Sequence, residues 1–124
     1  MKTIEVSSLV LAYLGDSVYE NYIRLFLIQK GINHVKKLQE ESLNYVSAKS
    51  QARIIHKLIN DDFFNQKELE IIKRARNSKT NSHPKNTDII TYKEATSLEA
   101  IIGYLKLENN IERIEELMNK IINS

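Results

Sequence analysis

Glycine and proline are scarce in this chain, and that scarcity limits what it can fold into. Three glycines and one proline occur in 124 residues. Apolar residues recur every three or four positions over most of the length, whereas the period-two alternation of a half-buried strand is rare. Both observations favour helices joined by short turns. We therefore predict an all-α fold, formed as a single domain over residues 1–124.

The apolar spacing and the residues that commonly cap helices divide the chain into six helical segments. They are expected at Glu5–Lys30, His34–Tyr45, Ala48–Ile59, Lys67–Asn77, Thr91–Leu107 and Ile111–Ile121. Side-chain N-caps are predicted at Asn33, Ser47 and either Asn109 or Asn110. Gly31 is expected to end a helix in the left-handed conformation, and Gly15 is expected to bend or break the first helix.

The same spacing predicts which side chains form the core. In the first two segments they are Leu9, Ala12, Tyr13, Tyr19, Tyr22, Ile23, Phe26, Leu27, Val35, Leu38 and either Ser42 or Leu43. In the other four they are Ala48, Ala52, Ile55, Ile59, Leu69, Ile72, Ala75, Ala95, Leu98, Ile102, Leu105, Ile111, Ile114, Met118 and Ile121.

Composition excludes several classes of protein. The chain has no cysteine, so it forms no disulfide and no thiolate metal site. Its apolar stretches are too short and too often interrupted by charge to span a membrane. The first ten residues, MKTIEVSSLV, lack the basic region and pure apolar core of a signal peptide. We expect a cytoplasmic protein with no membrane partner.

Positive charge is concentrated in one segment that overlaps the long loop Asn77–Asp88. The net charge is +2, but residues 73–87 carry five cations and no acid, which leaves −3 for the remainder. Local basic patches of this kind attract polyanions. The candidate phosphate-binding residues are Arg74, Arg76, Lys79 and Lys85. No aromatic residue is interleaved, which favours an RNA duplex over stacked single strands. The alternative is a solvated surface loop.

Two carboxylates stand in otherwise mostly apolar helical stretches. Asp16 lies in YLGDSVYENYI and Glu99 in TSLEAIIGYL. A carboxylate among apolar residues is costly unless something compensates it. Neither acid has a lysine or arginine three or four positions away to pair with on its own helix. Each acid can therefore cap another helix or pair with a distant cation. If the two helices pack together, the acids can instead hold a hard cation between them.

Four motifs in fixed order carry a family resemblance: AYLGDSVYE at 12–20, YVSAKSQA at 45–52, RARNSK at 74–79, and PKNTDIITYKEATSLEAIIGYL at 84–105. They resemble the ribonuclease III catalytic domain, which implies a helical bundle of that type. More narrowly, the chain resembles Mini-ribonuclease III, the short form that lacks a double-stranded-RNA-binding domain. The longer family pattern has two further acids where this chain has Ala12 and Thr96. The short form shares the reduced pair, and the number of bound metals is left open.

The resemblance implies a Mg²⁺-dependent endoribonuclease that cleaves structured double-stranded RNA and leaves 5′-phosphate and 3′-hydroxyl ends. Asp16 is expected to position the metal and the attacking water, and Glu99 to bind the metal directly. Mg²⁺ prefers oxygen ligands and commonly uses only one or two protein carboxylates. Glu20, one turn beyond Asp16, is expected to be either a solvated surface residue or an outer contact of the site.

The resemblance also implies a substrate and an assembly. The substrate is expected to be the precursor of 23S ribosomal RNA, with a large-subunit ribosomal protein as a candidate partner; Lys49 and Gln51 are further candidates for an RNA contact. A two-fold homodimer supplies one acid pair for each strand of a duplex, with residues 14–22 near its interface. Two alternatives remain from the residues alone. One is a non-catalytic double-stranded-RNA-binding module of the same fold, and the other is a helical protein-interaction domain.

Overall fold

The computed structural model describes residues 2–78, 85 and 87–123, and the secondary structure of these residues is entirely helical. A short 3₁₀ helix (Thr3–Glu5) precedes six α-helices: α1 (Ser8–Gln29), α2 (Val35–Val46), α3 (Ala48–Asn60), α4 (Gln66–Arg76), α5 (Ile89–Leu107) and α6 (Ile111–Ile122). The all-α prediction is confirmed. Within the described part of the chain, no helix is both long and apolar enough to cross a membrane.

Polar side chains fix where most of the helices begin. Five N-cap side chains each accept a hydrogen bond from the backbone N–H three residues later: Ser7, Ser47, Asn65, Asp88 and Asn110. The caps predicted at Ser47 and Asn110 are thus confirmed. The cap predicted at Asn33 is wrong, because His34 precedes α2 and its side chain makes no cap bond. The first helix begins at Ser8 rather than at Glu5, since Ser7 supplies the cap.

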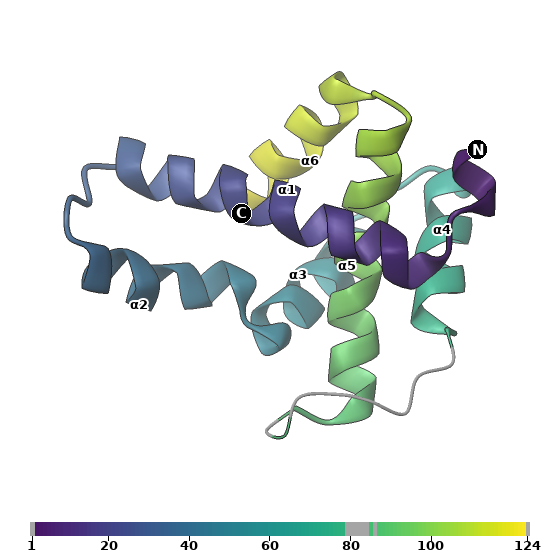
Figure 1. The fold of residues 1–124 in the computed structure, drawn as a ribbon, viewed down its shortest axis with the longest axis horizontal. Helices are drawn as coiled ribbons and strands as arrows, with labels where there is room; N and C mark the ends of the chain where they lie inside the picture. The colour runs from purple at the N-terminus through teal and green to yellow at the C-terminus, as the bar shows by residue number, and fades with distance from the viewer. Residues whose placement is uncertain (1, 79–84, 86, 124) are drawn as a thin grey trace.

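Helices α1 and α5 cross at the centre of the molecule, and two glycines form the contact (Figure 1). A Cβ atom built on Gly15 would lie 1.7 Å from the carbonyl oxygen of Glu99, and one on Gly103 would lie 1.9 Å from that of Leu11. No side chain fits between the two backbones there. The break that was one of the two alternatives predicted at Gly15 does not occur, because α1 continues through this residue. The close approach of α5 is what requires glycine there.

One apolar core surrounds this crossing. Helices α3 and α4 both pack on α5, and α2 packs on α1 and α3. The largest fully buried apolar side chains come from α1, α3, α5 and α6: Leu11, Tyr19, Ile23, Leu27, Ile55, Leu98, Ile101, Ile102, Ile114, Leu117 and Met118. The core positions predicted in α5, namely Ala95, Leu98, Ile102 and Leu105, are all buried.

Some residues predicted to be buried are instead exposed. In α1, Leu9 is 46% exposed and Tyr13 is 84% exposed, because this face of the helix points away from α5. Helix α2 has no buried residue, and its Val35 and Leu43 are largely exposed. Figure 1 shows α2 running below the C-terminal half of α1 at the edge of the molecule, so only one side of it meets the core. Ile111 is also exposed, at the first turn of α6.

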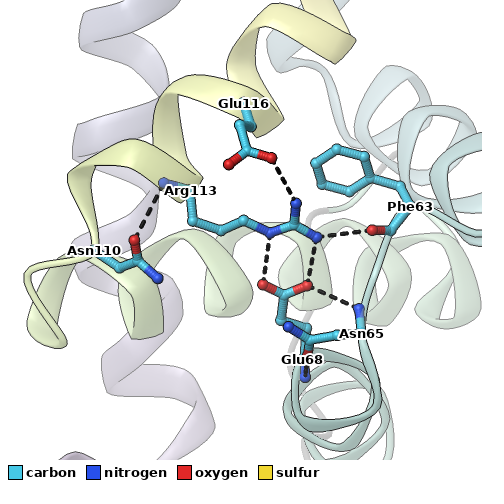
Figure 2. Close-up of polar contacts among 6 residues, drawn as sticks. All are labelled: Phe63, Asn65, Glu68, Asn110, Arg113 and Glu116. Carbon is cyan, nitrogen blue, oxygen red and sulfur yellow. Dashed lines mark hydrogen bonds and ion pairs between the residues drawn. The ribbon is translucent and has the colours of Figure 1, made fainter.

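An arginine on α6 holds that helix against the start of α4 (Figure 2). Arg113 donates to both carboxylate oxygens of Glu68 at 2.8 Å and to the carbonyl oxygen of Phe63 at 2.7 Å. Glu68 is 4% exposed and also accepts from the backbone N–H of Asn65 in a capping box. The guanidinium stacks 4.2 Å from the centre of the Phe63 ring. This network is a bidentate buried pair with its remaining acceptors satisfied.

Candidate metal centre and its surroundings

The crossing of α1 and α5 brings the two predicted acids together. Asp16 follows Gly15 on α1, and the Gly15 backbone lies against the carbonyl of Glu99 on α5. A hydrogen bond joins the two side-chain carboxyl groups. Asp16 is exposed and Glu99 is half-buried, so the pair sits where the core meets solvent. Asp16 and Glu99 are far apart in the sequence. They lie next to each other because Gly15 and Gly103 allow the backbones of α1 and α5 to touch.

The negative charges of Asp16 and Glu99 are only partly compensated by the groups around them. Burial raises the pKa of Glu99 from its ordinary value of 4.5 to about 8, and the charge and hydrogen bond of Asp16 add to the shift. A hydrogen bond from Gln51 opposes the shift by stabilising the carboxylate, and the charge of Glu20 adds a smaller increase to the pKa. At neutral pH the pair therefore retains a proton in the free protein.

The donor set fits a hard divalent cation. Both groups are carboxylates, and the leading electrostatic neighbours of Glu99 are acids and an amide rather than a lysine or arginine. Mg²⁺ is commonly bound through one or two carboxylates and retains several waters. Among the described residues, no group of three or more His, Cys, Asp or Glu side chains is arranged to hold a metal. The site is thus a pair, not a larger cluster.

Ala12 and Thr96, which stand where the longer family pattern has two further acids, are both buried. Ala12 is 6% exposed, and Thr96 is equally buried. The Thr96 hydroxyl donates to the backbone carbonyl of Tyr92 at 2.8 Å, one turn earlier on α5. Its hydrogen is therefore used within the helix. Glu20 is half-buried and forms an ion pair with Arg24 at 3.4 Å, so its carboxylate has a partner of its own.

The raised pKa of Glu99 predicts how stability depends on pH when no divalent cation is present. Since the folded pKa lies above the ordinary value, the unfolded chain holds fewer protons between about pH 4.5 and pH 8. The free energy of unfolding in EDTA should therefore fall as pH rises through this window, by at most about 1.4 kcal/mol per pH unit. Urea titrations at several pH values measure it. Glu99→Gln should flatten the profile, and an unchanged slope in that variant would contradict the assignment.

The predicted phosphate-binding residues are placed differently from one another. Arg74 donates to the carbonyls of Ile4 and Val6 and to the hydroxyl of Ser8, at 3.0–3.2 Å, and so fastens the N-terminal segment to α4. Arg76 is exposed at the end of α4, and Lys85 is exposed beyond it. Lys79 lies outside the described residues. An RNA contact of these four residues stays a prediction, with Arg74 already engaged by the fold.

Two further buried side chains lie near the acid pair, Gln51 on α3 and Tyr19 on α1. Gln51 was considered only as an RNA contact, yet it is buried and bonds to Glu99. A polar residue on the apolar face of an amphipathic helix is the signal that could have identified this role. Tyr19 was expected in the core, and it is fully buried there. Its hydroxyl donates to the carbonyl of Tyr45 at 2.8 Å and ties α1 to the end of α2.

Comparison with known proteins gives the class of this protein. Residues 9–110 match the Ribonuclease III domain family, and this range includes both acids and both crossing glycines. The X-ray crystal structure of a protein from Fusobacterium nucleatum superposes with a TM-score of 0.88 at 38% identity, and the match covers 100% of both chains. The fold and the match define an endoribonuclease of the ribonuclease III type, which acts on double-stranded RNA.

Relatives that match over most of their own length narrow the class to a branch. Mini-ribonuclease 3 of Staphylococcus aureus is 44% identical over 117 residues, covering 94% of this chain and 87% of that protein. Mini-ribonuclease 3 of Streptococcus pneumoniae is 43% identical over 114 residues, covering 92% and 89%. The chain belongs to the Mini-ribonuclease III family. The resemblance drawn from the four motifs is therefore confirmed.

Proposed function

We propose that this protein is a Mg²⁺-dependent endoribonuclease in which Asp16 and Glu99 hold the cation and carry the reaction. The observation that carries the proposal is the close backbone contact of Gly15 with Glu99, which brings Asp16 beside Glu99 at the α1–α5 crossing. Two acids brought this close in a folded protein repel each other unless a proton or a cation lies between them. Dependence on a divalent metal is also general among ribonuclease III enzymes, which supports the choice of cation.

The roles of the two acids follow from their different exposure. Glu99 is half-buried on α5, which packs against α1, α3, α4 and α6, so it offers a fixed ligand oxygen. Asp16 is exposed beside it and can orient a water for attack on the scissile phosphorus. A divalent cation bound here supplies charge neutralisation on the phosphodiester oxygens and lowers the pKa of water. Attack by water breaks the bond between phosphorus and the 3′-oxygen, which leaves 5′-phosphate and 3′-hydroxyl ends.

Isosteric neutral variants test this assignment. Asp16→Asn and Glu99→Gln each keep the side-chain shape and remove a charge from the pair, so kcat on a labelled RNA duplex should fall about 100-fold or more with Mg²⁺ present. Glu20→Gln is the matched control on α1. Its ion pair with Arg24 lies on the surface, and kcat should change by less than about threefold.

The same assay separates the alternatives. Undiminished Mg²⁺-dependent cleavage in both Asp16→Asn and Glu99→Gln would refute the proposed roles. If the unmodified protein bound the duplex but left it uncut with Mg²⁺ as with EDTA, a non-catalytic RNA-binding module would be the better description.

The proposed natural substrate is the 23S ribosomal RNA precursor. Its support is membership of the Mini-ribonuclease III family together with a basic segment that carries no aromatic residue for base stacking. A large-subunit ribosomal protein as partner and a cytoplasmic location remain part of the proposal. Incubation with precursor transcripts, followed by mapping of the new 5′ ends, tests the substrate. Cleavage of unrelated duplexes at equal rates would contradict a preference for this precursor.

The cations from the end of α4 onward are proposed to bind RNA phosphates. Substituting Arg76, Lys79 and Lys85 together by alanine should weaken duplex binding. The slope of log Kd against log salt concentration should also become shallower by about one for each phosphate interaction removed. Arg74 is kept, because it holds the N-terminal segment. Binding is measured by fluorescence anisotropy at several salt concentrations.

A matched triple variant controls for total charge. Lys36, Lys37 and Lys67 are exposed cations on α2 and α4. Substituting these three by alanine removes the same charge and should reduce the salt dependence much less. Equal slopes in the two triple variants would mean that the segment after α4 makes no special phosphate contact.

A homodimer is proposed because one chain carries a single acid pair and a duplex has two strands. The exposed face of α1 offers a surface for it, formed by Leu9, Val10 and Tyr13. These residues lie just before the acid site on the same helix. They lie just outside the range predicted near the interface, residues 14–22, and Tyr19 within that range lies in the core of the single chain. Sedimentation equilibrium that gave the mass of one chain at assay concentration would contradict the dimer.

A further inference from the structure

Buried polar side chains are few among the described residues, and most of them have a clear task in the fold. They are Ser8, Gln51, Glu68, Thr96 and Ser97. Ser8 and Glu68 accept hydrogen bonds from arginines that join distant segments. The hydroxyls of Thr96 and Ser97 donate to backbone carbonyls earlier on α5. Four of the five therefore complete bonds that hold helices in place.

Gln51 is the exception, because its side chain bonds to an acid of the candidate metal centre. It lies in the first turn of α3, fixed at its start by the Ser47 cap, and is 2% exposed. Helix α3 packs along α5, so the Gln51 side chain reaches Glu99 from the protein interior, where burial limits its own rotamers. The NH₂ group is the only donor of a glutamine side chain, so it is the group that bonds to a carboxylate oxygen of Glu99.

We propose that Gln51 is a positioning residue for the cation site: its buried amide holds the Glu99 carboxylate so that the free lone pairs of that group face Asp16. This inference rests on the proposed function of Asp16 and Glu99 as metal ligands. Ligand carboxylates are commonly oriented by outer hydrogen bonds of this kind, and loss of such a bond typically weakens metal binding about 10- to 100-fold.

The chemistry of the amide suits this task better than a cation would. An amide NH₂ group donates hydrogen bonds without carrying charge. A lysine or arginine at this position would also orient Glu99, but it would cancel the negative charge that attracts a divalent cation. Gln51 therefore stabilises one orientation of the carboxylate while leaving its charge available to the metal.

Metal binding measured without RNA tests the inference. Gln51→Met is close in size and removes the donor, so the Kd for Mn²⁺, measured by electron paramagnetic resonance of the free ion, should rise about tenfold. Thermal unfolding of the metal-free variant should remain near that of the unmodified protein. Duplex binding in EDTA should also be unchanged, because Gln51 is buried and away from solvent. Gln66→Met, at an exposed glutamine on α4, is the matched control and should leave the Mn²⁺ affinity as it was.

The outcomes distinguish this inference from the function on which it rests. If Gln51→Met binds Mn²⁺ as tightly as the unmodified protein while Glu99→Gln binds it weakly, Gln51 is a packing residue and only the inference falls. If Glu99→Gln also retains full Mn²⁺ affinity, the proposed metal ligands are wrong and the inference falls with them. Should Gln51→Met unfold, Gln51→Leu removes the same donor with a side chain that matches its apolar neighbours Ala52 and Ile55, and the same comparison applies.

Discussion

Gly15→Ala should destabilise this protein by about 3 kcal/mol or more and lower its Tm by roughly 10 °C. The added methyl group would lie 1.7 Å from the carbonyl oxygen of Glu99, so α1 and α5 must move apart. Helix propensity alone predicts the opposite sign, since alanine is favoured over glycine inside a helix by about 1 kcal/mol. The direction of the change in thermal unfolding therefore distinguishes tertiary contact from local preference. Cleavage should fall as well, because the shift separates Asp16 from Glu99.

Gly31→Ala provides the matched control. Gly31 follows α1 and has a φ of +107°, and a methyl group added there would meet no atom within 4 Å. Its substitution should cost only the backbone strain of a positive φ, about 1 to 2 kcal/mol, with cleavage retained. Equal losses of stability in the two variants, or a gain in Gly15→Ala, would show that the two backbones are not in contact at Gly15.

Arg113→Met should be the second severe substitution, with a loss of about 3 to 5 kcal/mol in the free energy of unfolding. It removes both hydrogen bonds to Glu68 and leaves that buried carboxylate without a cation. It also removes the bond to the Phe63 carbonyl and the stacking on the Phe63 ring. Urea titration in the pH range where glutamate is ionised measures the loss.

Two further variants identify the cause. Lys57→Met removes a surface ion pair with Asp61, in which the side chains are 55% and 36% exposed, and should change stability by less than about 1 kcal/mol. Adding Glu68→Gln to Arg113→Met should recover part of the loss, because the uncompensated charge is gone while an acceptor for the Asn65 N–H remains. Failure to recover any stability would assign the effect to packing around Phe63 instead.

Core positions could be predicted well from the sequence in α5 and less well in α2 and in the first half of α1. In α5 every predicted core position is buried, and the starts of α3 and α6 follow from the caps Ser47 and Asn110. In the first half of α1, apolar residues occur all around the helix, so periodicity does not show that Tyr13 points outward. The fold resolves this through the α1–α5 contact at Gly15, which determines the face that α1 buries.

The two acids of the candidate site could be identified from the sequence, but the residues that contact them from other helices could not. Asp16 and Glu99 stand out because they lie in mostly apolar stretches with no lysine or arginine three or four positions away, and the resemblance of their motifs to a known family implied their shared role. The bond from Gln51 joins α3 to α5, and the pair of Glu68 and Arg113 joins α4 to α6. Such long-range pairs depend on which helix faces meet, and that information is absent from the spacing within any one helix.

The close backbone contact at Gly15 and Gly103 means that main-chain atoms, not side-chain volumes, set the distance between the proposed metal ligands. The apolar residues of α6, as distinct from Arg113 and its partners, can then be exchanged for others of similar total volume so long as the crossing is kept. An engineer can exploit the same independence by repacking the α6 layer for heat tolerance while leaving the cutting rate untouched.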